Sequence, residues 1–275
     1  MGRLKHLKKP IVISFFNNKG GVGKSTLSGN LASKLADEYN VLLIDNDPQG
    51  NVSELLGQEQ DAEIRKAYLG KDFAIRPIDF NPKLIELEKR KRSDKRLSIL
   101  TGGNNLLEVE TLIKDKPARE TILKRNLDEA IKDFDFVIID NPPSKSVFVW
   151  NALYASDFVI IPFKPSLSEF SGIKSLKDMI DTMKTDLQHE LKILGILINM
   201  YTKSGVTDMY VTQVQETFDP RMVFDSGVRV AVNFMVAMPF GLPVDLLFGE
   251  KEDVVEMITA VKEEMIKKLE EKLWI

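Results

Sequence analysis

Cysteine is absent from all 275 residues of the chain, and histidine occurs only at His6 and His189. The lack of thiols excludes disulfides, thiolate metal sites, iron–sulfur clusters and cysteine nucleophiles. Two histidines this far apart in the sequence do not indicate a metal site built on imidazole. Any functional site must therefore use carboxylates, amides, hydroxyls, lysines and backbone groups.

Long apolar segments are also lacking. No run reaches the roughly 18 uncharged apolar residues of a membrane span. The longest candidate, residues 230–244, is interrupted by an asparagine, a glycine and two prolines. The basic segment 1–10 is not followed by the apolar region and small-residue cleavage site of a signal peptide. We therefore expect a cytoplasmic protein with no membrane partner.

The chain carries no strong charge of either sign. Its 38 lysines and arginines against 41 aspartates and glutamates give a formal net charge of -3. This balance excludes a uniformly basic nucleic-acid surface, so any contact with DNA must use a local patch. No linker rich in proline, glycine or serine divides the sequence, and we find no internal repeat. One domain over residues 1–275 is the prediction.

Short apolar runs alternate with amphipathic segments of helical length. Continuous apolar runs are typical of strands that are buried on both faces. The repeated strand–helix order predicts a doubly wound α/β fold with a mostly parallel sheet flanked by helices. The expected strands are residues 11–16, 41–44, 136–139, 158–163 and 193–200, and the expected helices are residues 25–38, 119–133, 171–187 and 207–218.

Two segments fit this alternation less well. Residues 57–96 are polar, with a charge run at 86–96, and we interpret them as an insertion of loop or short helices. Residues 251–275 have the pattern of an amphipathic C-terminal helix. Its apolar face would consist of Val254, Ile258, Val261, Met265 and Leu269.

The most informative motif is a glycine-rich loop between an apolar strand and a helical pattern, IVISFFNNKGGVGKST at residues 11–26. Glycines allow a tight turn in which several N–H groups point at phosphate oxygens, and the start of the next helix adds a partial positive charge. The motif predicts a P-loop for ATP or ADP, with Lys24 on the outer phosphates and Ser25 on Mg2+. The predicted nucleotide-binding residues here are Lys19, Gly20, Gly21, Val22, Gly23, Lys24, Ser25 and Thr26.

The loop departs from the ordinary pattern at two positions. Asn18 stands where the first glycine belongs, and Lys19 adds a second lysine. KGGVGKST resembles the deviant Walker A signature of the ParA/MinD superfamily of P-loop ATPases. The resemblance implies a homodimer in the ATP-bound state, in which Lys19 reaches across to the partner's nucleotide and takes part in catalysis.

Three aspartates at strand ends complete the predicted site. Asp45 and Asp47 lie in VLLIDNDPQGN at residues 41–51, and parallel strands deliver their C-terminal residues to the ligand crevice. The DPQGN continuation is similar to the ParA branch. That resemblance implies that Asp47 orients or activates the attacking water and that Asp45 supports the magnesium shell. Asp140, in DFVIIDNPPS, resembles the Walker B aspartate and would hold magnesium through water.

Two asparagines accompany this site. Asn141 stands between Asp140 and two prolines, where the family usually has a small residue, and leaves the magnesium role of Asp140 intact. Asn199, in LKILGILINMYTK at residues 191–203, falls where related ATPases contact the adenine. A polar residue near a strand end is equally consistent with a turn former. The resemblance covers roughly residues 9–247.

Three functions remain, because the lack of cysteine removes the branches of the superfamily that need thiols. The resemblance favours a DNA segregation ATPase that binds double-stranded DNA nonspecifically as a dimer on the nucleoid. Hydrolysis stimulated by a centromere-binding, ParB-type adaptor would reset it. The alternatives are a MinD-like membrane-associated positioning ATPase and a ligase like dethiobiotin synthetase. Balanced charge on residues 251–275 disfavours the first alternative, and Lys19 with DPQGN disfavours the second.

Two basic segments are candidates for DNA contact. The family places basic residues in its C-terminal third, but residues 221–244 carry only Arg221 and Arg229, and Asn233 stands where related sequences often have arginine. The second candidate is a run of basic residues, which is also typical of a solvated face. It consists of Lys83, Lys89, Arg90, Lys91, Arg92, Lys95 and Arg96.

Overall fold

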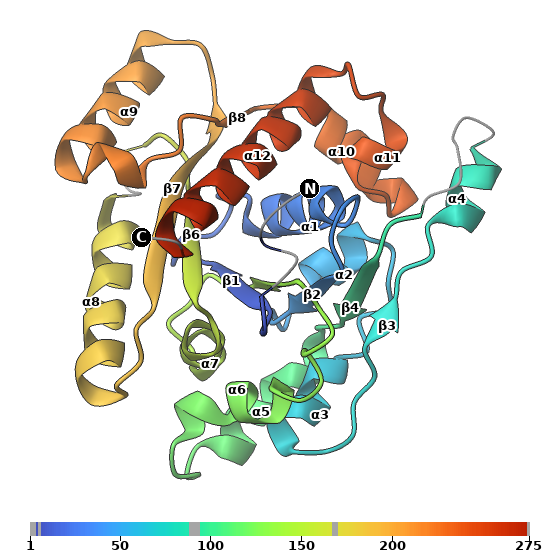
Figure 1. The fold of residues 1–275 in the computed structure, drawn as a ribbon, viewed down its shortest axis with the longest axis vertical. Helices are drawn as coiled ribbons and strands as arrows, with labels where there is room; N and C mark the ends of the chain where they lie inside the picture. The colour runs from blue at the N-terminus through green and yellow to red at the C-terminus, as the bar shows by residue number, and fades with distance from the viewer. Residues whose placement is uncertain (1–3, 5–6, 88–93, 167–169, 274–275) are drawn as a thin grey trace.

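The computed structural model describes residue 4 and residues 7–87, 94–166 and 170–273 (Figure 1). Its described strands form one eight-stranded sheet in the order β3-β4-β2-β5-β1-β6-β7-β8. Every pairing is parallel except that of β3 with β4. The strands are β1 Ile11–Phe15, β2 Val41–Asp45, β3 Arg76–Pro77, β4 Leu97–Leu100, β5 Phe136–Asp140, β6 Phe158–Phe163, β7 Lys192–Tyr201 and β8 Val228–Arg229.

Helices cover both faces of this sheet (Figure 1). One face packs against α1 and α12, and the other packs against α3, α6, α7 and α8. The helices are α1 Lys24–Leu35, α2 Asn51–Leu55, α3 Glu63–Leu69, α4 Asn81–Glu86, α5 Leu107–Ile113, α6 Ile122–Leu127, α7 Val147–Ala155, α8 Phe170–Asp186, α9 Gly205–Thr217, α10 Asn233–Ala237, α11 Val244–Leu247 and α12 Asp253–Leu273. The doubly wound α/β prediction is confirmed.

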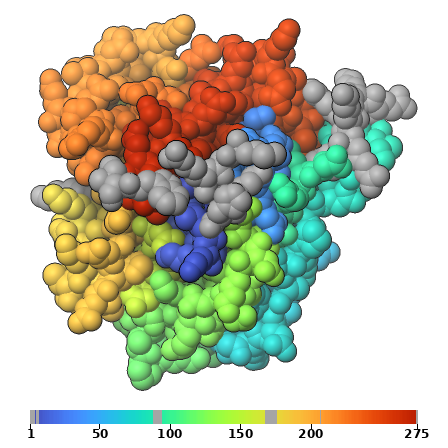
Figure 2. All heavy atoms as spheres, viewed as in Figure 1, coloured from blue at the N-terminus to red at the C-terminus, as the bar shows by residue number. Residues whose placement is uncertain are grey.

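The apolar runs form the central strands of the sheet, where both faces are covered. Every residue of β1, β2, β5 and β6 is buried. All five expected strands are present. The C-terminal helix is also present, and its expected apolar face is buried in the core at Val254, Ile258, Val261, Met265 and Leu269. In Figure 2 the orange and red atoms of the C-terminal third lie directly against the blue and yellow atoms of earlier segments.

One expected helix was wrong in extent. Residues 119–133 contain a short 3-10 turn and α6, which ends at Leu127. The chain then continues as turns toward β5. Asn40 fastens this stretch, because its backbone N–H donates to Asp135 and its side chain donates to the carbonyl of Asp133, each at 2.7 Å. Those bonds hold residues 133–135 beside β2 and are incompatible with a continuing helix.

Residues 57–96 contain α3, β3 and α4, and β4 follows immediately at Leu97. The helices of this segment are short, and α3 does more than cover the surface. Its Ile64, Ala67 and Tyr68 are completely buried in the core under the sheet. The sequence pattern did not indicate β3, β4 or α7.

The strand order places the carboxyl ends of β2, β5 and β1 side by side. In the parallel registers, Asp45 lies opposite Asp140, and Asp140 lies opposite Phe15. The chain runs outward from β1 through β2 to β4, returns to β5, and then crosses to β6 on the far side of β1. Ligands of such folds bind where the winding reverses, at the carboxyl edge. Within the described part of the chain, no helix is both long and apolar enough to span a membrane.

Candidate nucleotide site

The glycine-rich loop follows β1 at this edge and leads directly into α1. Gly21 and Gly23 have φ values of 73° and 84°, in the left-handed region that side-chain-bearing residues rarely adopt. Gly23 also lacks room for a side chain, because a Cβ there would lie 2.2 Å from Nδ2 of Asn199. No side chain caps the start of α1. The first N–H groups of the helix therefore remain directed toward the loop, as a phosphate site requires.

The two lysines of the loop differ in their surroundings. Lys24 is only 6% exposed, and its Nζ donates to the carbonyl of Lys19 at 2.9 Å. This contact folds the amine of Lys24 back over the loop. Lys19 is half-buried, and its own N–H donates to the side chain of Asn17 at 3.1 Å. The structure thus brings Lys24 to the centre of the loop and leaves Lys19 at its rim.

Asp45 is fully buried and is bound from two directions. Its Oδ2 accepts hydrogen bonds from the N–H and the hydroxyl of Ser53, at 2.9 and 2.6 Å, and its Oδ1 accepts from the N–H of Asp47 at 3.2 Å. Burial raises the pKa of Asp45, while the Ser53 bonds oppose the rise. These hydrogen bonds make Asp45 a brace for the loop that carries Asp47.

Asp140 differs from Asp45 in its hydrogen bonding. Both of its carboxylate oxygens are buried without a hydrogen-bond partner among the described residues. Burial and the nearby charge of Asp45 raise the pKa of Asp140, and the hydroxyl of Ser25 and the amine of Lys24 oppose the rise. A buried carboxylate without a partner is costly unless a cation accompanies it.

Magnesium fits this donor set. It prefers oxygen ligands, and it is usually held by one or two carboxylates together with substrate phosphates and water. No cluster of three or more histidine, aspartate or glutamate side chains that could hold a metal ion exists within the described residues. Asp140 and the hydroxyl of Ser25 are the groups that would hold the ion, and the ion would neutralise charge on the phosphates.

Asp47 lies beside the P-loop and lines a hollow with it. It is 4% exposed, and its Oδ1 accepts from the N–H of Gln49 at 2.9 Å. Burial raises its pKa, and the nearby Lys24 amine opposes the rise. Asp47 lines a hollow of about 250 Å³ with the P-loop, Pro143 and Met238. The P-loop residues in this hollow are Gly20, Gly21, Gly23, Lys24, Ser25 and Thr26.

Asn199 contacts the loop itself. It lies 3% exposed near the end of β7, where Met200 adopts a positive φ of 53° at a register shift. Its Nδ2 donates to the carbonyl of Val22 at 2.7 Å. Asn199 therefore fastens the P-loop to β7. Its contact with adenine stays a prediction.

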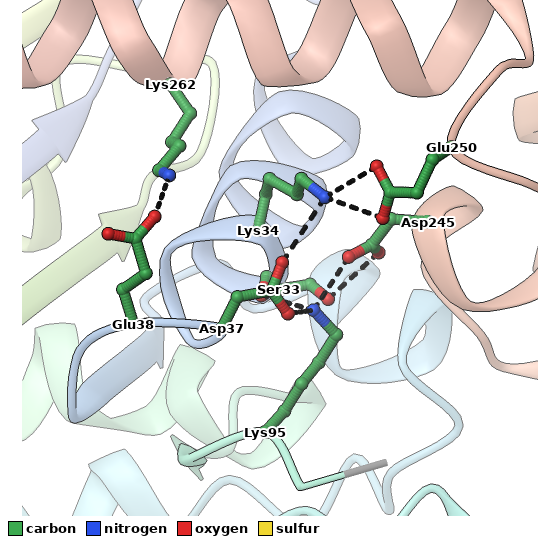
Figure 3. A network of polar contacts seen from close by, with 8 residues as sticks. All are labelled: Ser33, Lys34, Asp37, Glu38, Lys95, Asp245, Glu250 and Lys262. Atoms are coloured by element: carbon green, nitrogen blue, oxygen red, sulfur yellow. Dashed lines mark hydrogen bonds and ion pairs between the residues drawn. The ribbon is translucent and has the colours of Figure 1, made fainter. Parts of the chain in front are cut away.

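A second polar cluster holds the opposite end of α1 (Figure 3). The Nζ of Lys34 lies 3.0 Å from Glu250 and 3.3 Å from Asp37, and the Nζ of Lys95 lies 2.7 Å from Asp245. Figure 3 shows Lys262 reaching down from α12 to Glu38 just beyond α1. Members of this cluster are Ser33, Lys34, Asp37, Glu38, Lys95, Asp245, Glu250 and Lys262.

The comparisons with known proteins agree with this geometry. A family model described as an AAA domain matches residues 11–193. The chromosome partitioning protein ParA of Myxococcus xanthus (strain DK1622) is 32% identical over 262 residues, covering 94% of this chain and 88% of that protein.

The chain belongs to the ParA family of P-loop ATPases. Another relative of this ATPase, the sporulation initiation inhibitor protein Soj of Bacillus subtilis (strain 168), is 30% identical and covers 86% of this chain and 90% of its own.

Solved structures resemble the ParA-family fold described above. Apo McdA of Cyanothece has a TM-score of 0.78 at 18% identity, covering 93% of this chain and 99% of that chain. Cobyrinic acid a,c-diamide synthase of Mycobacterium smegmatis, with bound ADP and magnesium, has a TM-score of 0.68 at 26% identity and covers 84% of this chain and 92% of that chain. Nucleotide and magnesium thus occur together in a relative of this fold.

Sequence reasoning missed the residues that support the site from behind. Asn46 and Tyr68 are fully buried, and the hydroxyl of Tyr68 donates to Oδ1 of Asn46 at 2.8 Å. The signal available was weak: Asn46 sits between two conspicuous aspartates, and Tyr68 is a lone aromatic in a polar segment. Only the packing of α3 brings the two together.

Proposed function

We propose that this ParA-family ATPase segregates DNA. ATP binding drives a sandwich dimer, the dimer binds double-stranded DNA without sequence preference, and a centromere-binding, ParB-type partner stimulates the hydrolysis that resets it. The names of the relatives ParA and Soj, each aligned over at least 86% of the chain, support this cycle. The observation that carries it is the position of the nucleotide hollow, which opens beside an exposed apolar surface.

That surface consists of residues 230–240, around α10. Met235 is 73% exposed, and Met238 is 49% exposed while also lining the hollow with Lys24 and Asp47. Contiguous exposed apolar residues mark an interaction surface. A partner subunit placed over the hollow would cover them, and Lys19 at the rim would face its nucleotide. The exposed members are Val230, Val232, Met235, Val236, Met238 and Phe240.

Those expected DNA-contacting residues that the structure describes are engaged within the subunit. Arg221 pairs with Asp219 at 2.6 Å, and Arg229 pairs with Asp253 at 2.7 Å. Of the second candidate group, Lys95 is buried in the cluster of Figure 3, and Lys83 lies against the carbonyl of Gly241 at 3.5 Å. Lys89, Arg90, Lys91 and Arg92 lie outside the described residues. We propose that two modest basic patches act together in the dimer.

The alternatives receive less support. A MinD-like protein would need an exposed amphipathic helix, but the apolar face of α12 is buried in the core at Val254, Ile258 and Val261. The name of the cobyrinic acid a,c-diamide synthase relative raises a ligase alternative. A ligase would hydrolyse ATP appreciably only with an acceptor substrate present, whereas a partition ATPase would hydrolyse it slowly alone.

DNA binding is tested by titrating random-sequence duplex at several salt concentrations with a nonhydrolysable ATP analogue and with ADP. We expect binding only in the ATP-like state, with a log–log salt slope of about −0.9 per phosphate neutralised. Reversing the charges of Lys89, Arg90, Lys91 and Arg92 together should lower both affinity and slope. Reversal at Arg221 and Arg229 tests the other surface. Equal and negligible binding in both nucleotide states would reject the proposal.

The dimer is tested separately by light scattering with the same analogue. Lys19→Ala should bind nucleotide as a monomer and fail to dimerise, because the target of Lys19 lies on the other subunit. Met235→Glu should show the same defect, since it places a charge in the apolar surface. Met209→Glu is the matched control, because it makes the same substitution at a methionine that is 56% exposed on α9, outside that surface and outside the hollow. Normal dimerisation of Lys19→Ala would contradict the role given to this lysine.

A further inference from the structure

The residues next to the three aspartates form a second polar layer behind the nucleotide site. Asn46 separates Asp45 from Asp47, and Asn141 follows Asp140. Side chains alternate between the two faces of an extended chain, so each asparagine points away from the face of its neighbouring aspartate. Asn46 contacts Tyr68 of α3 and Phe148 of α7 on that side. Both asparagines are 0% exposed. Their amide groups bond to other groups of the protein, so we infer that they act on the site through the chain around them.

The two asparagines join the acidic loops of β2 and β5. Nδ2 of Asn46 donates to Oδ1 of Asn141 at 3.0 Å and to the carbonyl of Phe148 at 2.9 Å. Oδ1 of Asn46 accepts from the Tyr68 hydroxyl at 2.8 Å. The Tyr68 ring packs edge-on against Phe148, with centroids 5.5 Å apart. Packing thus holds the tyrosine, and the tyrosine orients the amide of Asn46.

Asn141 extends the connection to the strand that leads into the P-loop. Its Nδ2 lies 3.2 Å from the carbonyl of Phe15 and 3.3 Å from the hydroxyl of Ser14. One side chain therefore touches β1 and, through Asn46, the loop after β2, while its own backbone belongs to the loop after β5. The three segments that carry the P-loop, Asp47 and Asp140 meet at this amide.

We propose that the Asn46–Asn141 pair, anchored by Tyr68, is a positioning clamp for ATP hydrolysis. A buried network whose members all have partners is rigid and specifies one arrangement. The clamp sets the separation between the Asp47 loop and the Asp140 loop, and displacement of a reacting group by about 1 Å costs on the order of a hundredfold in rate. It rests on the assignment of Asp47 and Asp140 to the site and is independent of DNA binding.

Tyr68→Phe is the sharpest test, because it keeps the buried ring and removes only the hydroxyl. We expect kcat to fall about fivefold, while KM and the affinity for a fluorescent ATP analogue stay within about twofold. Tyr39→Phe is the matched control. Tyr39 is 2% exposed and packs on Phe136 over the other face of the sheet. It should change neither kcat nor KM.

Asn141→Ala should lower kcat by about thirtyfold and reduce the gain in nucleotide affinity that Mg2+ provides, because Asp140 is displaced. Its control is Asn151→Ala. Asn151 is also 0% exposed, and its amide bonds the N–H of Leu123 and the carbonyls of Arg119 and Val147. This control should lose stability with no change in kcat.

The double variant Tyr68→Phe/Asn141→Ala distinguishes a clamp from two separate structural contributions. Because Tyr68 acts through Asn46 on Asn141, the double variant should be no slower than Asn141→Ala alone. Multiplied effects, or a full kcat in either single variant, would overturn the clamp.

Asp47→Ala tests the assignment of Asp47 to the site separately from the clamp. If this variant retained wild-type turnover, the site assignment would fail. If it were inactive while Tyr68→Phe stayed fully active, only the clamp would fail.

Discussion

The two ends of α1 lie roughly 15 Å apart. They differ in whether the buried charged groups around them have partners within the fold. Lys24 at the first end and Lys34 near the last are equally buried, at 6% exposure each. Lys34 has two carboxylate partners, Glu250 and Asp37. Around Lys24, the carboxylate of Asp140 is buried with no hydrogen-bond partner in the described part of the chain.

This difference separates the chemistry of stability from the chemistry of function. Burying a charge is unfavourable unless its partners are supplied by the fold or by a ligand. At the cluster in Figure 3 the fold supplies them, and α1 is tied to α12 and to the segment before β4. At the P-loop the fold leaves the carboxylate of Asp140 without such a partner, and the magnesium that accompanies a bound nucleotide would supply one.

The largest expected effect is at the nucleotide end. Lys24→Ala should weaken ATP binding by about a hundredfold or more, because the outer phosphates lose a direct charged hydrogen bond. Lys34→Ala is the matched control from the same helix and should bind ATP as the wild type does. Isothermal titration calorimetry measures both. Comparable losses in the two variants would show that the distinction between the ends is false.

The next largest effect is a loss of stability at the C-terminal end of α1. Lys95→Met leaves Asp245, whose side chain is 2% exposed, without its cation. We expect the free energy of unfolding to fall by about 3 kcal/mol, measured by urea denaturation, with ATP affinity unchanged. The double variant Lys95→Met/Asp245→Leu removes both charges and should recover most of that loss. No recovery would mean that packing of the lysine stem, and not charge, dominates.

Asp140→Asn sharpens the comparison, because it should stabilise the protein without nucleotide and at the same time impair its response to Mg2+ and an ATP analogue. Removing one of two neighbouring buried carboxylates should raise the free energy of unfolding without nucleotide by about 1 kcal/mol. The same change should abolish the additional stabilisation given by Mg2+ with an ATP analogue. Thermal unfolding with and without Mg2+ and analogue checks both parts. If Asp140→Asn were less stable than the wild type in the absence of nucleotide, Asp140 would have a partner within the fold.

The smallest effect is expected at Asn199. Asn199→Ala removes the hydrogen bond to Val22 and should lower the free energy of unfolding by about 1 kcal/mol and ATP affinity by a few-fold. If Asn199 only fastens the loop, the preference for ATP over GTP should be unchanged. A changed preference in competition binding would support the adenine contact expected from the family resemblance.

Local patterns were sufficient for the strands and the phosphate loop. An apolar run such as residues 136–139 can only be stable when covered on both faces, and β5 is buried throughout. The glycines at positions 21 and 23 are needed for positive φ values that the backbone itself requires. Asp45, Asp47 and Asp140 could be placed together because parallel strands end at one edge.

Contacts between distant segments could not be inferred in this way. Lys95 belongs to a charge run that favours a solvated face, yet its side chain is 5% exposed because α1 and α11 bring Asp37 and Asp245 to it. Tyr68 lies in a segment expected to be peripheral, yet its hydroxyl reaches the back of the nucleotide site.

The sequence by itself determined the fold class, the P-loop and the three acidic strand ends, because each depends on neighbours within a few residues or on the rule that parallel strands share an edge. The tertiary structure alone decided which buried polar groups have partners. A side chain's partners come from whichever elements pack against it, and the partners of Asn46, Lys95 and Asp245 lie 22 to 212 positions away. That separation is why the orphaned carboxylate of Asp140 and the satisfied amide of Asn141, adjacent in the chain, could be told apart only in the folded protein.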